Sequence, residues 1–167
     1  SAGGPYTLTA RASRGATQTI SDVLVGDVWL CSGQSNMVVE VRRTLDSRAE
    51  IANSANDRLR MLTVPMAASV TPEQAFAAPV QWQVAGPSTV SEWSATCFYF
   101  ARELQRTVRA PMGMVVAAWG GANIRAWMSN EALRATGDYN EGLDILARAA
   151  RWMAYKVLAL PDQAGKP

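Results

Sequence analysis

The residues of this chain best suited to chemistry lie in a short polar segment directly after an apolar run. The run Val28–Cys31 is followed by Ser32-Gly33-Gln34-Ser35-Asn36-Met37. Gly33 permits a tight turn, and we expect a helix from about Ser35, so that backbone N–H groups and the positive end of the helix dipole surround its hydroxyl. This setting suits a nucleophilic serine, because such N–H groups stabilise the negative oxygen of an acyl-transfer intermediate. The alternative is a structural N-cap.

A second polar segment that contains glycine follows another apolar run. Met114–Trp119 is apolar and ends at Gly120-Gly121-Ala122-Asn123. In open α/β sheets, ligands bind beyond the carboxyl ends of the strands. These two strand exits are therefore the expected place of a functional site, and the structural alternative for the glycine pair is a plain turn.

Histidine is absent from the chain, although it is the usual general base of serine and cysteine hydrolases and the commonest metal ligand. The chain by itself therefore lacks a complete Ser-His-Asp triad, a Cys-His dyad and a His-rich zinc site. The G-x-S-x-G elbow of α/β-hydrolases is also missing, since Met37 occupies the place of its second glycine. No glycine-rich phosphate loop is present, so we expect no nucleotide cofactor.

A β hairpin is predicted at the start of the chain. Residues 6–12 alternate apolar and polar side chains, and a second strand-like stretch covers residues 17–25. Such a hairpin is too small to stand alone. We therefore expect residues 1–25 to be the tail of a preceding β domain.

The elements that position the two polar segments follow from residue 26 onward. The run Val28–Cys31 predicts a strand that is buried on both faces. Helices are predicted over residues 94–108 and 143–160 from apolar spacings of three and four, the second stopped by Pro161. Further strands are predicted at residues 59–64, 80–84 and 114–119. The alternation predicts an α/β fold with a mostly parallel sheet that is unfinished in this chain.

Composition excludes several classes of partner. Sixteen basic and 14 acidic residues give a formal net charge of +2 without clustering, which argues against nucleic acid and anionic membranes. No apolar run approaches the ~20 residues of a membrane span, and a secretion signal is expected to be absent or already removed. Cys31 and Cys97 are too few for a disulfide scaffold and are expected as small core residues, and whether they form a disulfide is left open by the sequence.

A family resemblance covers about residues 3–129. The nucleophile block of the sialate O-acetylesterase family, within the SGNH hydrolases, resembles the segment Gly26-Asp27-Val28-Trp29-Leu30-Cys31-Ser32-Gly33-Gln34-Ser35-Asn36-Met37. The likeness continues through residues 82–85, 98–104 and 119–128, and residues 3–6 are similar to the end of the β domain that precedes the catalytic domain. The resemblance implies a three-layer, flavodoxin-like parallel sheet, with residues 26–167 as its N-terminal part.

The resemblance also implies roles for single residues. Ser35 matches the nucleophile, and the backbone amide of Gly121, or of Gly120, matches an oxyanion donor. Substrate contacts are expected from Gln34, Asn36, Asn123 and Trp127. The other tryptophans, at positions 29, 82, 93, 119 and 152, are expected in the core or at interfaces. Neither a metal nor a cofactor is implied, because ester hydrolysis needs only a nucleophile, a base and oxyanion donors.

Two departures from the family pattern affect the expected function. Ala122 stands where relatives often carry a hydroxyl residue, and Arg125 stands where they often carry an acidic residue. The later family blocks, a Gln-Gly-Glu-like segment and an Asp-x-x-His segment, have no counterpart in this chain. We therefore expect a carbohydrate O-acetylesterase whose catalytic Asp and His come from a C-terminal segment or second chain. The alternatives are an acetylxylan or other polysaccharide acetylesterase, and a non-catalytic, carbohydrate-contacting subunit. The resemblance favours a secreted, periplasmic or lysosomal location.

Overall fold

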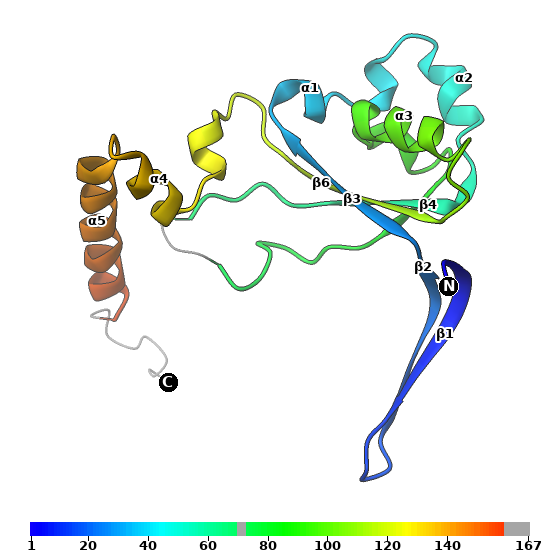
Figure 1. The fold of residues 1–167 in the computed structure, drawn as a ribbon, viewed down its shortest axis with the longest axis horizontal. Helices are drawn as coiled ribbons and strands as arrows, with labels where there is room; N and C mark the ends of the chain where they lie inside the picture. Colours follow the sequence, from blue (N-terminus) through cyan, green and yellow to red (C-terminus); the bar gives the residue numbers. More distant parts are fainter. Residues whose placement is uncertain (70–72, 159–167) are drawn as a thin grey trace, which may run out of the picture. The chain divides into compact units, whose positions relative to one another are not determined.

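The computed structural model of the chain describes residues 1–69 and 73–158, with side chains as far as residue 151 in the last helix (Figure 1). Two compact units can be distinguished among these residues. The first comprises Ser1–Met66 and Phe76–Ala122, and the second the described parts of Ala67–Ala75 and Asn123–Pro167. Both polar segments named above, as far as Ala122, lie in the first unit.

A four-stranded sheet forms the centre of the first unit, in the order β3-β6-β4-β5. Its strands are β3 (Asp27–Gly33), β4 (Asn56–Thr63), β5 (Gln83–Ala85) and β6 (Met112–Ala118). Strand β6 runs parallel to both β3 and β4, and β5 is antiparallel to β4. The register pairs Gly33 with Ala118, so β3 and β6 end side by side and the segments that follow them leave the sheet together.

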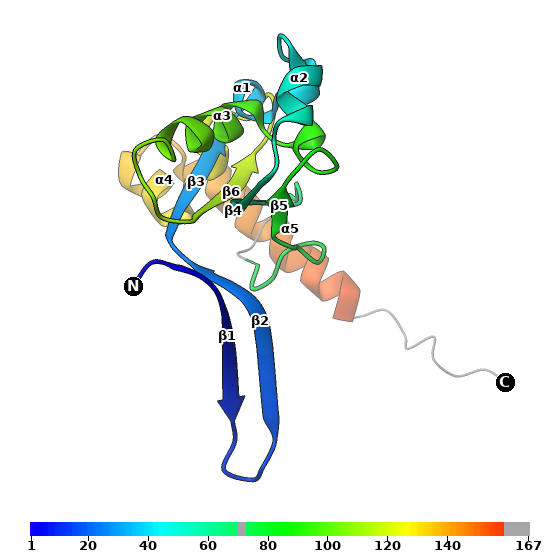
Figure 2. The same ribbon diagram turned by 90° about the vertical axis from the view of Figure 1, so that its right-hand side faces the viewer.

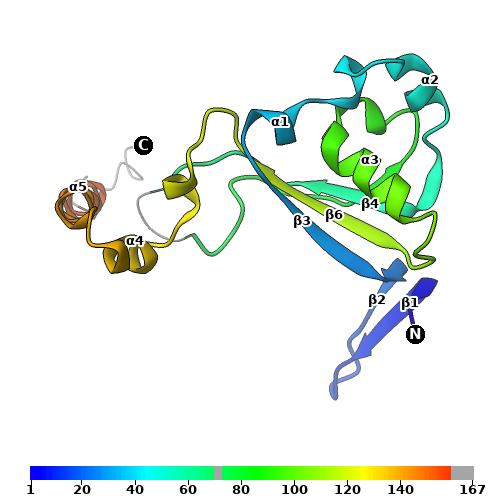
Figure 3. The same cartoon turned by 45° about the horizontal axis from the view of Figure 1, so that its top comes forward.

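Three helices cover one face of this sheet, as Figures 1, 2 and 3 show. They are α1 (Ser35–Val38), α2 (Ser47–Ala52) and α3 (Ala95–Leu104). Helix α3 is capped by Ser94, whose side chain accepts a hydrogen bond from the backbone amide of Cys97, and it buries Phe98 and Ala101 against the sheet. Other members of the core are Val41, Leu59, Met61, Val90, Trp93, Met112, Met114 and Val116.

The prediction that β3 is buried on both faces is wrong. Cys31 is buried and Trp29 packs edge-on against Phe100 of α3, but Val28 and Leu30, on the opposite face, are 67% and 71% exposed. Among the described residues of this unit, no helix covers that face, and β3 is hydrogen-bonded to β6 alone. Burial of a strand depends on its neighbours, which an apolar run does not reveal.

The predicted N-terminal hairpin is confirmed. Strands β1 (Gly3–Arg11) and β2 (Thr17–Val25) pair in an antiparallel ladder. The hairpin meets the sheet at Gly26, where an added Cβ would lie 2.0 Å from the carbonyl oxygen of Pro111. An ion pair of 2.6 Å between Asp22 and Arg60 also joins β2 to β4.

The second unit contains η3 (Ile124–Trp127), α4 (Asn130–Thr136) and α5 (Asn140–Leu158). Ser129 caps α4, and Gly137 ends it with a left-handed φ of 84°. The predicted amphipathic helix is confirmed as α5, whereas Pro161 and the side chain of Trp152 lie outside the described residues. A search of the described helices for a segment long and apolar enough to span a membrane finds none.

Candidate active site

Ser35 is the first residue of the single-turn helix α1, and its side chain is exposed. The cap position belongs to Gln34, which makes no side-chain capping hydrogen bond. The N-cap alternative for Ser35 is therefore wrong. The helix predicted from Ser35 is present but ends at Val38, so nearby amide groups, more than a long helix dipole, act on the hydroxyl.

The turn before Ser35 needs glycine. Gly33 has a φ of 141°, in a region that L side chains rarely adopt, and an added Cβ would lie 3.0 Å from Cγ of Met37. Because Gly33 ends β3, this conformation turns the chain directly from the strand into α1. The tight turn predicted there is confirmed.

The second glycine segment lies next to Ser35. A Cβ built on Gly120 would be 3.9 Å from Cα and 4.0 Å from Cβ of Ser35. Two backbone hydrogen bonds hold the turn. The amide of Trp119 donates to the carbonyl oxygen of Gly33 at 2.9 Å, and the amide of Ala122 donates to the carbonyl oxygen of Trp119 at 3.1 Å. The two strand exits that were expected to hold a functional site therefore lie side by side at Ser35 and Gly120.

The amide groups of the glycine pair are free to act as donors. Within the described chain, neither Gly120 nor Gly121 donates its N–H to a protein acceptor. Gly121 has a φ of 79°, and no atom lies within 4 Å of an added Cβ. An exposed serine thus lies next to Gly120, and the backbone amides of Gly120 and Gly121 are unused donors of the kind that stabilise an oxyanion in acyl transfer.

The other candidate site residues fall into two groups. The exposed Gln34 and Asn36 flank Ser35 directly, and their substrate contacts remain predictions. Asn123 and Trp127 belong to the second unit. There the Asn123 side chain caps η3 by accepting from the amide of Arg125 at 3.1 Å, and Trp127 is half-exposed.

Glu40, the acidic residue closest in sequence after Ser35, is held by arginines. Its carboxylate contacts Arg42 at 3.0 Å and Arg43 at 2.9 Å. A hydrogen bond from its own backbone amide, and then the charges of Arg43 and Arg42, lower the pKa of Glu40 below the ordinary carboxyl value. A carboxylate with a lowered pKa is a weaker base, which makes Glu40 poorly suited to act as the general base for Ser35.

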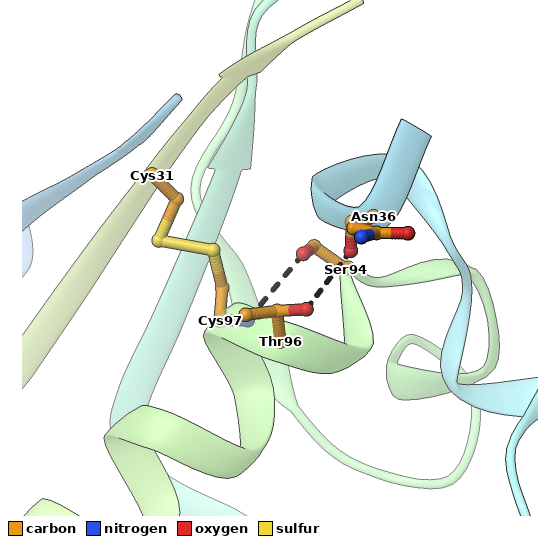
Figure 4. Close-up of a disulfide and its surroundings, with 5 residues drawn as sticks. All are labelled: Cys31, Asn36, Ser94, Thr96 and Cys97. Atoms are coloured by element: carbon orange, nitrogen blue, oxygen red, sulfur yellow. Dashed lines mark hydrogen bonds between the residues drawn. A yellow bond between two sulfur atoms is a disulfide. The ribbon is translucent and has the colours of Figure 1, made fainter. Parts of the chain in front are cut away.

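Sequence reasoning missed a disulfide beside the site. Cys31 of β3 is bonded to Cys97 of α3, with their Cα atoms 6.3 Å apart (Figure 4). Both residues are buried, as expected for core positions, but they are not free thiols. The available signal was that each lies on the inward-facing side of its own element.

A cavity of about 490 Å³ lies in another part of the first unit. It is lined by the base of the hairpin and the beginnings of β3 and β6, together with Arg60 and Trp82. Strands β3 and β6 begin at the cavity and end at Gly33 and Ala118, close to Ser35 and Gly120, so this cavity is separate from the candidate active site.

Comparisons with known proteins identify the family of the chain. Residues 25–160 match the family model described as carbohydrate esterase, sialic acid-specific acetylesterase. The human sialate O-acetylesterase is 36% identical over 150 residues, which are 84% of this chain and 29% of the relative. The mouse sialate O-acetylesterase is 33% identical over 146 residues, or 81% of this chain and 27% of the relative.

A solved structure is also similar. The crystal structure of a carbohydrate acetylesterase from Xanthomonas citri matches with a TM-score of 0.73 and 39% sequence identity. The match covers 79% of this chain and 30% of that chain. The chain thus spans less than a third of the length of the relatives that it matches.

Proposed function

Because this chain belongs to the family of sialic acid-specific carbohydrate acetylesterases, we propose that it carries the nucleophile half of an enzyme that removes acetyl esters from sugar hydroxyls. Residues 26–167 would form the N-terminal part of a three-layer, SGNH-like esterase domain. Residues 1–25 would belong to a preceding β domain. The acetylated sugar is the proposed substrate, and no cofactor is part of the proposal.

One observation carries this proposal: the contact between Ser35 and the Gly120–Gly121 turn. In the proposed reaction, Ser35 Oγ attacks the acetyl carbonyl carbon while a base takes the hydroxyl proton. The carbonyl oxygen becomes negative and accepts hydrogen bonds from the amides of Gly121 and Gly120. The bond to the sugar oxygen then breaks, the base returns the proton to that oxygen, and water releases acetate from Ser35.

The base is proposed to lie in a C-terminal segment or second chain. The chain has no histidine, and the relatives are more than three times as long as the matched region. The uncovered edge of β3 and the exposed Val28 and Leu30 beside it favour an additional strand and apolar cover at this place. Both features fit a sheet that continues in another segment.

Labelling with a fluorophosphonate ester tests the nucleophile. In the protein assembled with its C-terminal segment, we expect one labelled residue, Ser35, and no label in Ser35→Ala. Ser32→Ala is the matched control, because Ser32 is an exposed serine in the same strand exit and has no role in the proposed reaction. Label on another serine, with Ser35 unmodified, would refute the assignment.

The substrate is tested separately from the nucleophile. Acetylated sialic acids and acetylated xylo-oligosaccharides, offered to the assembled enzyme, distinguish a sialate esterase from a polysaccharide esterase. The comparisons favour the first.

The absence of histidine favours a second candidate function, a non-catalytic subunit that contacts carbohydrate. Intact mass spectrometry of the purified protein distinguishes the two. A copurifying C-terminal peptide supports the enzyme, and a stable, monodisperse and inactive 18 kDa species supports the subunit.

A further inference from the structure

Residues at the beginning of α3 contact the chain on both sides of Ser35, at Cys31 and at Asn36. Before Ser35, the disulfide from Cys97 holds Cys31. After it, the Thr96 hydroxyl donates a hydrogen bond of 2.9 Å to the carbonyl oxygen of Asn36, as Figure 4 shows. The short stretch that starts α3 therefore fastens the chain before and after the serine.

Two backbone hydrogen bonds extend the same contact. The amide of Ala95 donates to the carbonyl oxygen of Val39 at 2.8 Å, and the amide of Val41 donates to the carbonyl oxygen of Trp93 at 3.0 Å. These bonds hold the chain after α1, whereas the Thr96 bond reaches the carbonyl group of Asn36, the residue that follows Ser35. Thr96 is therefore the side chain whose hydrogen bond lies closest to the serine in sequence.

Ser35 depends on such external contacts because α1 is a single turn of four residues. An isolated helix of this length is unstable, and among the side chains of α1 only Met37 is partly buried against the core. The position of the Ser35 hydroxyl relative to Gly120 is consequently set by what the flanking residues bind. Asn36 is the residue directly after the serine.

The Thr96 hydroxyl is not used by its own helix. The cap of α3 is provided by Ser94, whose Oγ accepts from the amide of Cys97 at 3.4 Å. A helical threonine commonly bonds a carbonyl of the preceding turn, but the Thr96 bond runs to a segment 60 positions earlier in the chain. A β-branched residue has a slightly unfavourable helix propensity, and the bond to Asn36 gives a reason for its presence here.

We propose that Thr96 is a positioning residue that holds the Asn36 peptide unit, and through it Ser35, at its place beside Gly120. The proposal rests on the proposed function, in which Ser35 is the nucleophile. The Cys31–Cys97 disulfide is the second fastening of the same segment. Loss of the Thr96 bond leaves substrate binding intact and reduces the fraction of time in which Ser35 is in line with the acetyl group.

The test uses the full-length protein that includes the C-terminal segment, with an aryl acetate as substrate. Thr96→Val removes the hydroxyl and keeps the shape, and we expect kcat to fall about tenfold with KM unchanged. Thr96→Ser keeps the donor and restores kcat to within about twofold. Thr107→Val is the matched control, because Thr107 is an exposed threonine after α3 whose hydroxyl donates to the carbonyl of Leu104 at 3.1 Å, far along the helix from Ser35.

Amide hydrogen exchange of the same variants provides a readout that does not need catalysis. We expect the amides of residues 35–39 to exchange several-fold faster in Thr96→Val than in the wild type, with β6 unchanged. Equal exchange in this segment, or equal loss of kcat in Thr96→Val and Thr96→Ser, would overturn the proposal. A wild type without esterase activity refutes the proposed function, while the exchange comparison still decides whether Thr96 holds the segment.

Discussion

Two glycines of the strand exits, Gly33 and Gly121, have backbone conformations that residues with a side chain rarely adopt. Gly33 and Gly121 have φ values of 141° and 79°, and each ends a strand exit of the same sheet. A residue with a side chain loses about 1–2 kcal/mol of folding free energy, relative to glycine, when it adopts a left-handed φ. At Gly121 that strain is the only structural penalty, because no atom lies within 4 Å of an added Cβ. Its role in turnover can therefore be measured apart from its role in packing.

Gly121→Val is expected to reduce turnover far more than stability. A branched side chain would obstruct the amide that serves the oxyanion, and loss of one oxyanion donor costs about 3 kcal/mol of transition-state stabilisation. Gly137→Val is the matched control, since Gly137 has a similar φ of 84° and equally open surroundings. Urea unfolding should show similar losses in both variants, whereas kcat of the assembled enzyme should fall only in Gly121→Val. Proportional losses of activity and folded fraction in Gly121→Val would indicate a structural turn.

Because of Glu40, the free energy of unfolding of the first unit is expected to depend on pH in the acid range. Because its folded pKa is lowered below 4.5, its contribution is present above the unfolded pKa and is lost as pH falls through the folded pKa. Wild type should therefore be more stable than Glu40→Gln at pH 7, and the difference should be smaller at about pH 3. Urea midpoints at the two pH values check this, and an equal difference at both would contradict it.

Among the elements, β3 leads directly into the candidate site, and one of its faces is exposed. It ends at the turn into α1, carries Cys31 four residues before Ser35, and pairs with β6 in the register that brings Gly120 to the serine. The junction between β3 and the N-terminal hairpin is tightly packed. The amide of Asp27 donates to the carbonyl of Pro111 at 3.0 Å, and this close approach leaves no room for a side chain at Gly26.

Gly26→Ala is expected to destabilise the first unit by about 3 kcal/mol, because the new Cβ would lie 2.0 Å from the backbone oxygen of Pro111. Gly86→Ala is the control, since nothing lies within 4 Å of a Cβ at Gly86. Urea unfolding monitored by tryptophan fluorescence measures both. Equal midpoints for the two variants would show that the hairpin junction adapts.

The disulfide between β3 and α3 should contribute about 4 kcal/mol to stability, because it links residues 66 positions apart in the chain and restricts the unfolded state. Addition of a reductant should lower the urea midpoint of the wild type. The double variant Cys31→Ala/Cys97→Ala should be insensitive to reductant. A wild-type midpoint that does not change with full reduction, verified by thiol titration, would contradict the expectation.

Elements with a clear period could be predicted from sequence, and contacts between elements could not. The hairpin strands, β4, β6, α3 and α5 follow from apolar spacing, and the meeting of Ser35 with Gly120 follows from the general place of ligand sites in parallel sheets. The exposure of Val28 and Leu30, the Cys31–Cys97 bond and the Thr96 contact all depend on which elements are neighbours. That information is not contained in a local pattern.

For the whole molecule, the main question is how the chain functions when it spans less than a third of its relatives. A serine hydroxyl is a weak nucleophile near neutral pH and needs an adjacent base. With no histidine in the chain and Glu40 held by arginines, the catalytic unit must be larger than residues 1–167 if the proposed function holds.

Residues 1–167 alone are expected to show no esterase activity above the spontaneous rate. Addition of a C-terminal segment with the Asp-x-x-His block is expected to restore it. Hydrolysis of an aryl acetate, followed against protein concentration with Ser35→Ala as the control, measures both. Robust hydrolysis by the isolated chain that is lost in Ser35→Ala would show that another base acts, and an inactive assembly would favour the non-catalytic subunit.

The uncovered edge of β3 also bears on how the isolated chain behaves during expression. A strand with unpaired backbone groups along one edge and exposed Val28 and Leu30 on one face is a template for strand addition between molecules, and so for aggregation. Recombinant residues 1–167 are therefore expected to collect in inclusion bodies, and coexpression with the C-terminal segment should bring them into the soluble fraction.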